Sequence, residues 1–187
     1  REYVCDDGAT DEIRCYHDEL RALDRALNRL FDALEARGVA DETMVILSSD
    51  HGEGLGEHGH FGQHASTLFE EQIHVPLVVW YPPLSPRTVA EPVSLLDLYA
   101  TLEELTSGRL ERGFSLTRHF AGPAEVRPVL SHHWSGLVLG VGVRRTALIR
   151  RDDKLEYDWR TGYIRYVRLG EDPAETSNHA GAHPKTA

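Results

Sequence analysis

The fold is decided by the stretch at residues 43–54, which reads TMVILSSDHGEG. Its first half, residues 43–48, is an apolar run rich in strand formers, and it follows a helical pattern at 12–37 after a brief turn. A helix, a short loop and an unbroken apolar strand are typical of a buried parallel sheet. We therefore predict an α/β fold whose binding site lies in the glycine-rich loop after this strand, at its carboxyl end.

A long amphipathic helix is predicted for residues 12–37, where apolar side chains recur at alternating steps of three and four residues. Asp11 is placed to cap its first turn, and Gly38 can adopt the left-handed conformation that follows many helices. A stripe of this kind also fits a coiled-coil scaffold, which would make the chain dimeric. Because a strand follows closely, we expect the stripe to pack on a sheet.

The rest of the chain divides into a second α/β stretch and a run of closely spaced strands. We predict a buried strand at 75–80 and an amphipathic helix at 94–105 that ends near Gly108. A small antiparallel sheet is expected from strands at 128–132, 137–151, 154–159 and 163–169.

Length and charge limit the class of protein. The 187 residues, 41% hydrophobic and 27% charged, suit one folded domain with a small appendage. No apolar run reaches the roughly 18–20 residues that span a bilayer, so we expect no membrane span in this chain. The net charge of −10 argues against a nucleic-acid partner, since phosphate contacts need a basic face.

The negative charge is concentrated in the first part of the chain. Residues 1–75 hold 17 acidic and 6 basic residues, and five of the 11 histidines fall between positions 51 and 74. Carboxylates and imidazoles gathered in one stretch favour a bound cation. A solvated helix surface is the alternative explanation for most of the acids in 1–42.

The two cysteines, Cys5 and Cys15, indicate neither a zinc ribbon nor a redox pair, because they lack C-x-x-C spacing. One disulfide is compatible with an exported chain, but we expect two thiols. The compartment is left open.

Asp50 and His51 are the main candidates for a functional pair. They come where the strand ends, and Gly52 lets the backbone turn away behind them. A carboxylate beside an imidazole can hold one face of a divalent metal ion. The alternative is a glycine-rich turn in which the Asp and His only cap backbone groups.

Five motifs follow this strand in order: Asp50-His51-Gly52-Glu53, Leu55-Gly56-Glu57-His58-Gly59, His64, Leu68-Phe69-Glu70-Glu71 and Val75-Pro76-Leu77. In this order they resemble the sulfatase family of the alkaline phosphatase superfamily. The resemblance covers nearly all of 12–180, although Ala100 stands where the family segment V-S-x-x-D-L-x-P-T-L has proline. It implies part of an alkaline-phosphatase-like mixed or parallel sheet flanked by helices, followed by a small C-terminal antiparallel sheet.

Position by position, the resemblance implies that Asp50 and His51 are metal ligands and that His64 contacts the sulfate oxygens of a substrate. Cleavage of a sulfate ester builds negative charge, which a divalent cation and a donating imidazole neutralise. The resemblance ranks Ca²⁺ first. Mn²⁺ is the second choice, because calcium tolerates the nitrogen of His51 poorly.

The other histidines are expected to have lesser roles. His58 and His60 fall in a variable stretch of the family, so surface or supporting positions are expected for them. His74 precedes a strand and is expected to pack or to cap. The pair at 132–133, next to Trp134, can line a substrate pocket or simply end a polar strand.

The signature that sulfatases share most, C-x-P-x-R or S-x-P-x-R, occurs nowhere in the sequence. Its Cys or Ser is oxidised to formylglycine, the nucleophile of the family, so we expect formylglycine upstream of these residues and no catalytic residue within them. The paired N-terminal acidic ligands of the family are also missing, since Asp6-Asp7 lies in the wrong place. We expect the C-terminal portion of a sulfatase-like enzyme, inactive alone, whose partner is the N-terminal part of the same protein.

These expectations describe a sulfuric ester hydrolase fragment that acts on a sulfate-ester small molecule or glycan. A phosphonate or phosphodiester hydrolase, or a phosphoethanolamine-type transferase, of the same superfamily is the alternative, and a non-catalytic truncated module is a second. We assign residues 1–125 to the α/β catalytic domain, 126–177 to the antiparallel β subdomain and 178–187 to a flexible tail.

Overall fold

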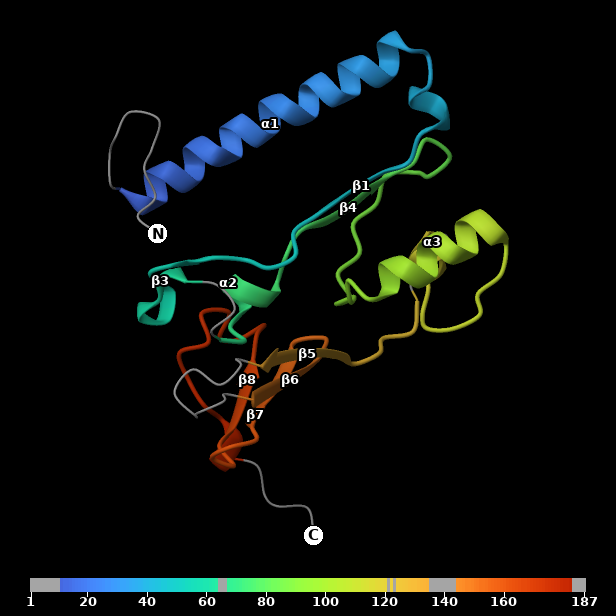
Figure 1. Ribbon diagram of the computed structural model, residues 1–187. Helices are drawn as coiled ribbons and strands as arrows, with labels where there is room; N and C mark the ends of the chain where they lie inside the picture. Colours follow the sequence, from blue (N-terminus) through green and yellow to red (C-terminus); the bar gives the residue numbers. More distant parts are fainter. Residues whose placement is uncertain (1–10, 64–66, 121, 123, 135–143, 183–187) are drawn as a thin grey trace. The chain divides into compact units, whose positions relative to one another are not determined.

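The computed structural model describes residues 11–63, 67–120, 122, 124–134 and 144–182, and the chain divides into two compact units, Arg1–Ser85 and Pro86–Ala187 (Figure 1). The helices are α1 (Glu12–Ala36), α2 (Glu70–Ile73) and α3 (Asp97–Ser107), with 3-10 turns η1 (Ala40–Glu42), η2 (Glu57–Gly59), η3 (Leu116–His119) and η4 (Ala180–Ala182). The strands are β1 (Val45–Ser48), β2 (Gly54–Leu55), β3 (Phe61–Gln63), β4 (Leu77–Trp80), β5 (Val129–Trp134), β6 (Arg144–Arg150), β7 (Asp153–Asp158) and β8 (Ile164–Arg168).

Helix α1 matches the predicted helix in its extent and in both of its ends. The Asp11 carboxylate accepts a hydrogen bond from the Arg14 N–H at 3.2 Å, and Gly38 has φ of 68°. Phe31, which lies outside the predicted apolar stripe, meets Trp80 of β4 edge to face, with ring centroids 5.5 Å apart, and this contact joins α1 to β4. Leu20, near the middle of the stripe, nevertheless remains 45% exposed.

Cys15 contradicts the expectation of two thiols. It is 2% exposed and disulfide-bonded. The disulfide that the sequence analysis named as the alternative is therefore the one the structure supports.

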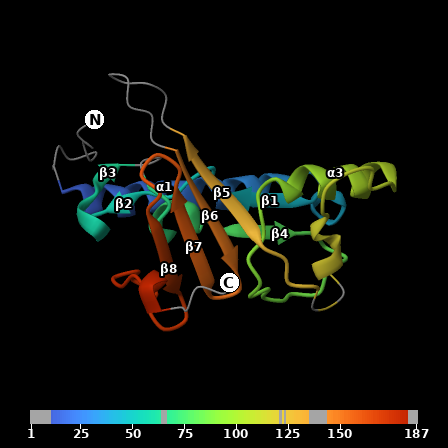
Figure 2. The same cartoon turned by 90° about the horizontal axis from the view of Figure 1, so that it is seen from below.

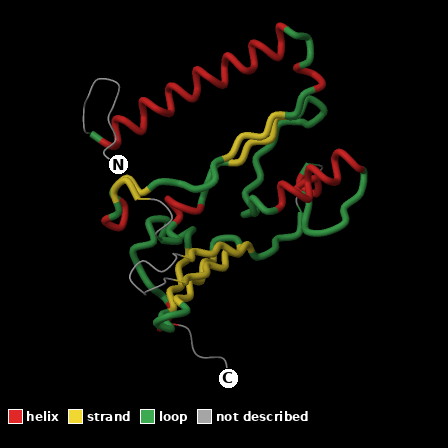
Figure 3. Tube along the Cα trace, in the orientation of Figure 1, coloured by secondary structure: helices red, strands yellow, loops and turns green. Residues whose placement is uncertain are grey.

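Strands β1 and β4, the paired yellow segments near the centre of Figure 3, form one sheet of the first unit. They run antiparallel, with Ser48 opposite Leu77 and Ile46 opposite Val79. The helix and the apolar strands predicted a buried parallel sheet, but β1 and β4 pair antiparallel, and Val78 in the middle of β4 is 52% exposed. The end of β1 is tied to the start of β4, because the Ser48 hydroxyl donates to the Pro76 carbonyl at 2.9 Å.

Helix α3 starts three residues later than predicted and ends as predicted at Gly108, which has φ of 71°. Its start is delayed because Ser94 and Asp97 form a turn of their own: the Ser94 N–H donates to the Asp97 carboxylate at 3.2 Å. The buried Thr101 hydroxyl donates to the Asp97 carbonyl at 2.6 Å and accepts from the Leu116 N–H at 2.8 Å, which joins α3 to η3.

The second unit contains the predicted antiparallel sheet, in the order β5-β6-β7-β8 (Figure 2). A tight turn with Arg151 at φ of 55° joins β6 to β7, and a turn with Gly162 at φ of 72° joins β7 to β8. Asn178 holds the segment that follows: its side chain accepts from the Tyr166 N–H and donates to the Ile164 carbonyl. None of the helices in the described part of the chain is both long and apolar enough to cross a membrane.

The buried face of this sheet carries charged side chains. Lys154 of β7 is 1% exposed, and its Nζ lies 3.0 Å from the Glu175 carboxylate. Arg165 of β8 lies 3.3 Å from the same carboxylate, and its guanidinium also donates to the Glu175 carbonyl. The alternate residues of the strands, such as Leu155, point to the other face and are exposed. The interior of this sheet therefore contains paired charges beside the apolar Ile149 and Val167, which stand opposite Lys154 in the register.

Replacing Glu175 with glutamine is expected to destabilise the protein by about 3–5 kcal/mol, because the buried Lys154 would lose the carboxylate 3.0 Å from its Nζ and Arg165 would depend on the more distant Glu156, at 3.8 Å. Urea unfolding measures the effect. The control is Glu171→Gln, which breaks an exposed pair with Arg168 and should cost under about 1 kcal/mol. Equal effects of the two substitutions would contradict a buried ionic interior.

Acid should destabilise the same sheet through Asp158. The Thr161 backbone N–H above all, and then the Arg145 guanidinium, lower the pKa of this carboxyl from 3.8 to about 2. Since folding favours the ionised form, the stabilisation is complete above pH 4 and is lost as the pH falls towards 2. Asp158→Asn should therefore flatten the decline of the urea midpoint between pH 4 and pH 2, and an unchanged slope would refute the assignment.

Candidate metal and anion site

The predicted pair, Asp50 and His51, lies in the loop that leaves β1. The Ser49 hydroxyl donates to the His51 carbonyl at 2.6 Å, and the His51 N–H donates to the Asp50 carboxylate at 3.1 Å. These bonds fold the two residues into a compact turn directly after the strand. The Asp50 side chain is 87% exposed, and the His51 side chain is 41% exposed. Both side chains are therefore accessible to an ion from solution.

The tautomer of His51 follows from its hydrogen bond. Its Nδ1 lies 2.9 Å from the Gly52 carbonyl, and a carbonyl can only accept, so Nδ1 carries a proton, and in the neutral ring the lone pair is on Nε2. Histidines that bind metal ions commonly donate their other ring N–H to a backbone carbonyl in this way. The ring of His51 is thus oriented as a ligand requires.

The two candidate ligand atoms converge. His51 Nε2 lies 3.7 Å from Asp50 Oδ2. Two ligands at ~2.1 Å from one ion lie roughly 3.0–3.4 Å apart at right or tetrahedral angles, and around Ca²⁺, with bonds of ~2.4 Å, they lie roughly 3.4 Å apart at a right angle. A movement of a few tenths of an ångström therefore lets both atoms bind one divalent ion, and the pair fits the expected metal.

Two ligands make only part of a metal site. Among residues 11–63, 67–120, 122, 124–134 and 144–182, no group of three or more His, Cys, Asp or Glu side chains is arranged to hold an ion. Six or more ligands surround Ca²⁺ or Mg²⁺. The described residues therefore offer at most two ligands to an ion at Asp50 and His51, and an ion bound there would need further ligands from elsewhere.

Gly52 is required because the loop touches α2. The Gly52 N–H donates to the Gln72 carbonyl at 2.9 Å, and a Cβ atom at Gly52 would lie 2.0 Å from the Glu71 carbonyl oxygen. The predicted reason for this glycine was a turn of the backbone. The structure adds a second and stricter one, since no side chain fits between the two segments.

His58 joins the same loop to α2 from its other end. Its ring stacks on Phe69, with ring centroids 3.6 Å apart, and its Nδ1 lies 2.9 Å from the Glu71 carboxylate. The backbone of His58 is left-handed, with φ of 52°. The expected supporting position of His58 is confirmed, while Glu71 had no assigned role, because nothing in the spacing of 13 residues predicts their contact.

Three of the remaining candidate histidines have different positions. His64 lies outside the described residues, directly after the end of β3, so its contact with sulfate stays a prediction. His74 caps the end of α2 through its backbone N–H, as expected. The ring of His132 lies 2.9 Å from the Thr146 hydroxyl on the C-terminal sheet.

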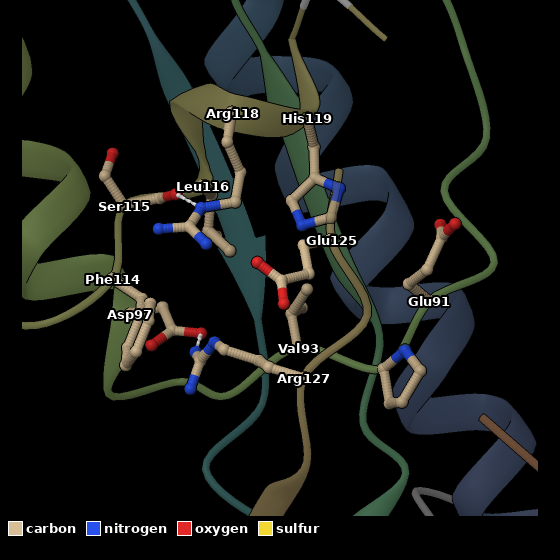
Figure 4. A pocket seen from close by; sticks show the side chains of 11 residues that line it. Glu91, Val93, Asp97, Phe114, Ser115, Leu116, Arg118, His119, Glu125 and Arg127 are labelled. Carbon is tan, nitrogen blue, oxygen red and sulfur yellow. Dashed lines mark hydrogen bonds and ion pairs between the residues drawn. The ribbon is translucent and has the colours of Figure 1, made fainter. Parts of the chain in front are cut away.

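A small cavity of about 10 Å³, enough for about one water molecule, lies in the second unit between α3 and η3 (Figure 4). Arg127 forms an ion pair with Asp97 and lies over the Phe114 ring, 4.0 Å from its centroid. His119 is 9% exposed, and burial above all lowers the pKa of its imidazole. Its Nδ1 has no hydrogen-bond partner among the described residues, so a single water is the occupant that fits.

Comparison with known proteins identifies the family. A family model described as Sulfatase matches residues 1–108, which is more than half of the chain, and the chain belongs to the sulfatase family. It is 29% identical to arylsulfatase K of Xenopus laevis over 93% of this chain, and 30% identical to choline-sulfatase of Rhizobium meliloti over 70%. The chain spans only 35% and 26% of the lengths of these two relatives.

Solved structures show the same fold. A 2-O GAG sulfatase aligns with a TM-score of 0.79 at 21% identity, over 90% of this chain and 38% of that one. A phosphonate monoester hydrolase from Silicibacter pomeroyi aligns with a TM-score of 0.70 at 21% identity, over 84% of this chain and 34% of that one. The predicted α/β fold with a small C-terminal antiparallel sheet is confirmed.

The substitution Gly52→Ala tests the contact between the loop and α2. The new Cβ must push two backbones apart and break the bond from Gly52 to Gln72, so we expect a loss of about 1–3 kcal/mol in the free energy of unfolding. Gly122→Ala is the control, since a Cβ there meets nothing within 4 Å. A loss no greater than that of the control would contradict the close approach.

Proposed function

We propose that this chain supplies one wall of the divalent-metal and sulfate-binding site of a sulfuric ester hydrolase. One observation carries the proposal: in a member of the sulfatase family, Asp50 Oδ2 and His51 Nε2 lie 3.7 Å apart, and the His51 tautomer leaves the ligand lone pair on Nε2. Calcium is the first candidate for the ion, as the family resemblance implies, and manganese is the second because one donor is nitrogen.

The chemistry divides between the ion and the protein. A bound divalent cation would polarise the sulfate group and offset the charge that develops on its oxygens. Asp50 and His51 would hold that ion on a loop fixed to β4 and α2, and His64 would donate to the sulfate. The attacking formylglycine is proposed to lie on polypeptide outside these 187 residues, because the C-x-P-x-R or S-x-P-x-R signature is absent from them.

The substrate class follows from what the relatives share. The names arylsulfatase, choline-sulfatase and steryl-sulfatase share the sulfate ester and differ in the group that carries the sulfate. We therefore propose that the reacting group of the substrate is a sulfate ester.

A phosphonate ester is the second candidate substrate. A tetrahedral phosphonate anion presents similar oxygens to a metal ion, and a phosphonate monoester hydrolase shares the fold. Turnover of matched aryl sulfate and aryl phosphonate by a longer form of the protein that includes the nucleophile would separate the two.

The metal pair can be tested on the 187-residue chain itself. Paramagnetic Mn²⁺ should broaden the NMR signals of the His51 imidazole selectively, and Ca²⁺ should compete with it. Asp50→Asn removes the charged ligand, so the Mn²⁺ concentration that gives the same broadening should rise at least about tenfold.

Asp41→Asn is the matched control, because Asp41 is an exposed carboxylate of η1 in the same unit. It should leave the titration unchanged. Equal behaviour of both variants, or broadening that is uniform over all histidines, would exclude a metal site at Asp50 and His51.

A further inference from the structure

The exposed face of the C-terminal sheet carries a cluster of aromatic side chains at one end. Trp134 ends β5, Tyr157 lies on β7, and Trp159 follows directly after β7. Together with Arg144, the first residue of β6, we call these residues the aromatic platform. Trp134 is 81% exposed and Trp159 is 56% exposed. Large aromatic rings exposed side by side mark interaction sites more often than chance placement does.

The backbone places Trp134, Arg144 and Trp159 in one row across neighbouring strands. Trp134 stands opposite Arg144 in the register of β5 and β6, and the Trp159 N–H donates to the Arg144 carbonyl at 2.9 Å. Figure 2 shows β5, β6 and β7 side by side in this order. Two strand spacings of ~4.8 Å put the backbones of the two tryptophans roughly 10 Å apart, which gives the platform room for more than one sugar ring.

The Trp159 ring is fixed before any ligand arrives. Its Nε1–H donates to the Thr146 hydroxyl at 2.9 Å, and Tyr157 packs against it edge to face with ring centroids 4.9 Å apart. The Arg144 guanidinium lies 5.5 Å from the ring centroid of Trp159. A rigid aromatic surface with a cation at its edge loses little conformational entropy on binding.

We propose that the aromatic platform binds a sulfated saccharide. The C–H bonds of a sugar ring carry partial positive charge and stack on the negative faces of aromatic rings. The planar guanidinium of Arg144 suits a tetrahedral oxyanion, because it donates two parallel hydrogen bonds. The sulfate part of this inference rests on the proposed function, while the sugar part rests on the tryptophans alone.

A single-stranded nucleic acid also stacks on exposed aromatic rings, but it needs a basic surface. Residues 76–187 hold 13 acidic and 14 basic residues, so the part of the chain with the platform is close to neutral. The charges therefore favour a ligand with few anionic groups over a polyanion.

The three tryptophans of the chain make the test direct. In the 187-residue chain, a disaccharide, N-acetyllactosamine 6-sulfate, should shift the NMR signals of the Trp134 and Trp159 indole N–H groups saturably. Trp80 on β4, outside the platform, serves as the internal reference and should not move. Unsulfated N-acetyllactosamine should shift the same two signals with weaker affinity, and oligothymidylate should not displace the sugar.

Two substitutions separate the parts of the platform. Trp134→Ala should lower the affinity for both sugars at least about tenfold. Arg144→Gln should lower the affinity for the sulfated sugar to that for the unsulfated one and leave the latter unchanged. The matched controls are Arg150→Gln, at the far end of the same strand on the same face, and Tyr99→Ala, an exposed aromatic residue of α3. Neither substitution should change the affinity for either sugar.

The proposal is overturned if no saturable shift occurs, if the Trp80 signal shifts equally, if Arg144→Gln and Arg150→Gln behave alike, or if oligothymidylate binds more tightly than the sugar. Its failure is distinguishable from failure of the metal site, because Trp134→Ala should leave the Mn²⁺ titration of His51 unchanged. Conversely, Asp50→Asn should leave the binding of the sugar unchanged.

Discussion

The loop that carries Asp50 and His51 depends on one close contact between two backbones. The Gly52 N–H meets the Gln72 carbonyl at 2.9 Å, and the space at the Gly52 α-carbon is already filled by the carbonyl of Glu71. Because the contact leaves no room for a side chain, the loop cannot shift along α2 without losing it. Gln72 in turn is 3% exposed, and its side chain accepts from the Thr67 N–H. The candidate pair is therefore placed by the hydrogen bonds of Gly52 and Gln72 and not by its own exposed side chains.

The buried face of the C-terminal sheet mixes charged and apolar side chains. Ile149 and Val167 are buried on either side of Lys154, and the charge of Lys154 is balanced by Glu175. The apolar and aromatic residues at the alternate positions are then left on the outer face, where Leu130 and Trp134 are exposed. Successive side chains of a strand point to opposite faces of the sheet. The same alternation therefore places the paired charges on the buried face and the aromatic platform on the exposed face.

Local signals predicted most of the fold, and contacts between distant residues account for what they missed. Asp11 and Gly38 marked both ends of α1, and Asp50 and His51 were chosen as candidate ligands because they follow an apolar strand directly. The stacking of His58 on Phe69 was not predicted, since eleven residues separate them and no period relates them. The inverted faces of β7 were missed for a similar reason: alternation reveals two faces, but only the position of Glu175 shows that the face with Lys154 is the buried one.

If the proposed function is correct, Asp50 has to be exposed in this chain, because the remaining ligands must reach the same metal ion. Neighbouring residues supply two ligands at a low entropic cost, because the turn that holds them is already formed by the bonds of Ser49 and Gly52. The remaining ligands must then approach from the open side, where Asp50 is 87% exposed. If they lie on other polypeptide, binding of the ion and docking of that polypeptide favour each other by the same free energy, since such coupling is reciprocal. Weak binding of metal by this chain alone and tight binding by a completed site are therefore consequences of the same geometry.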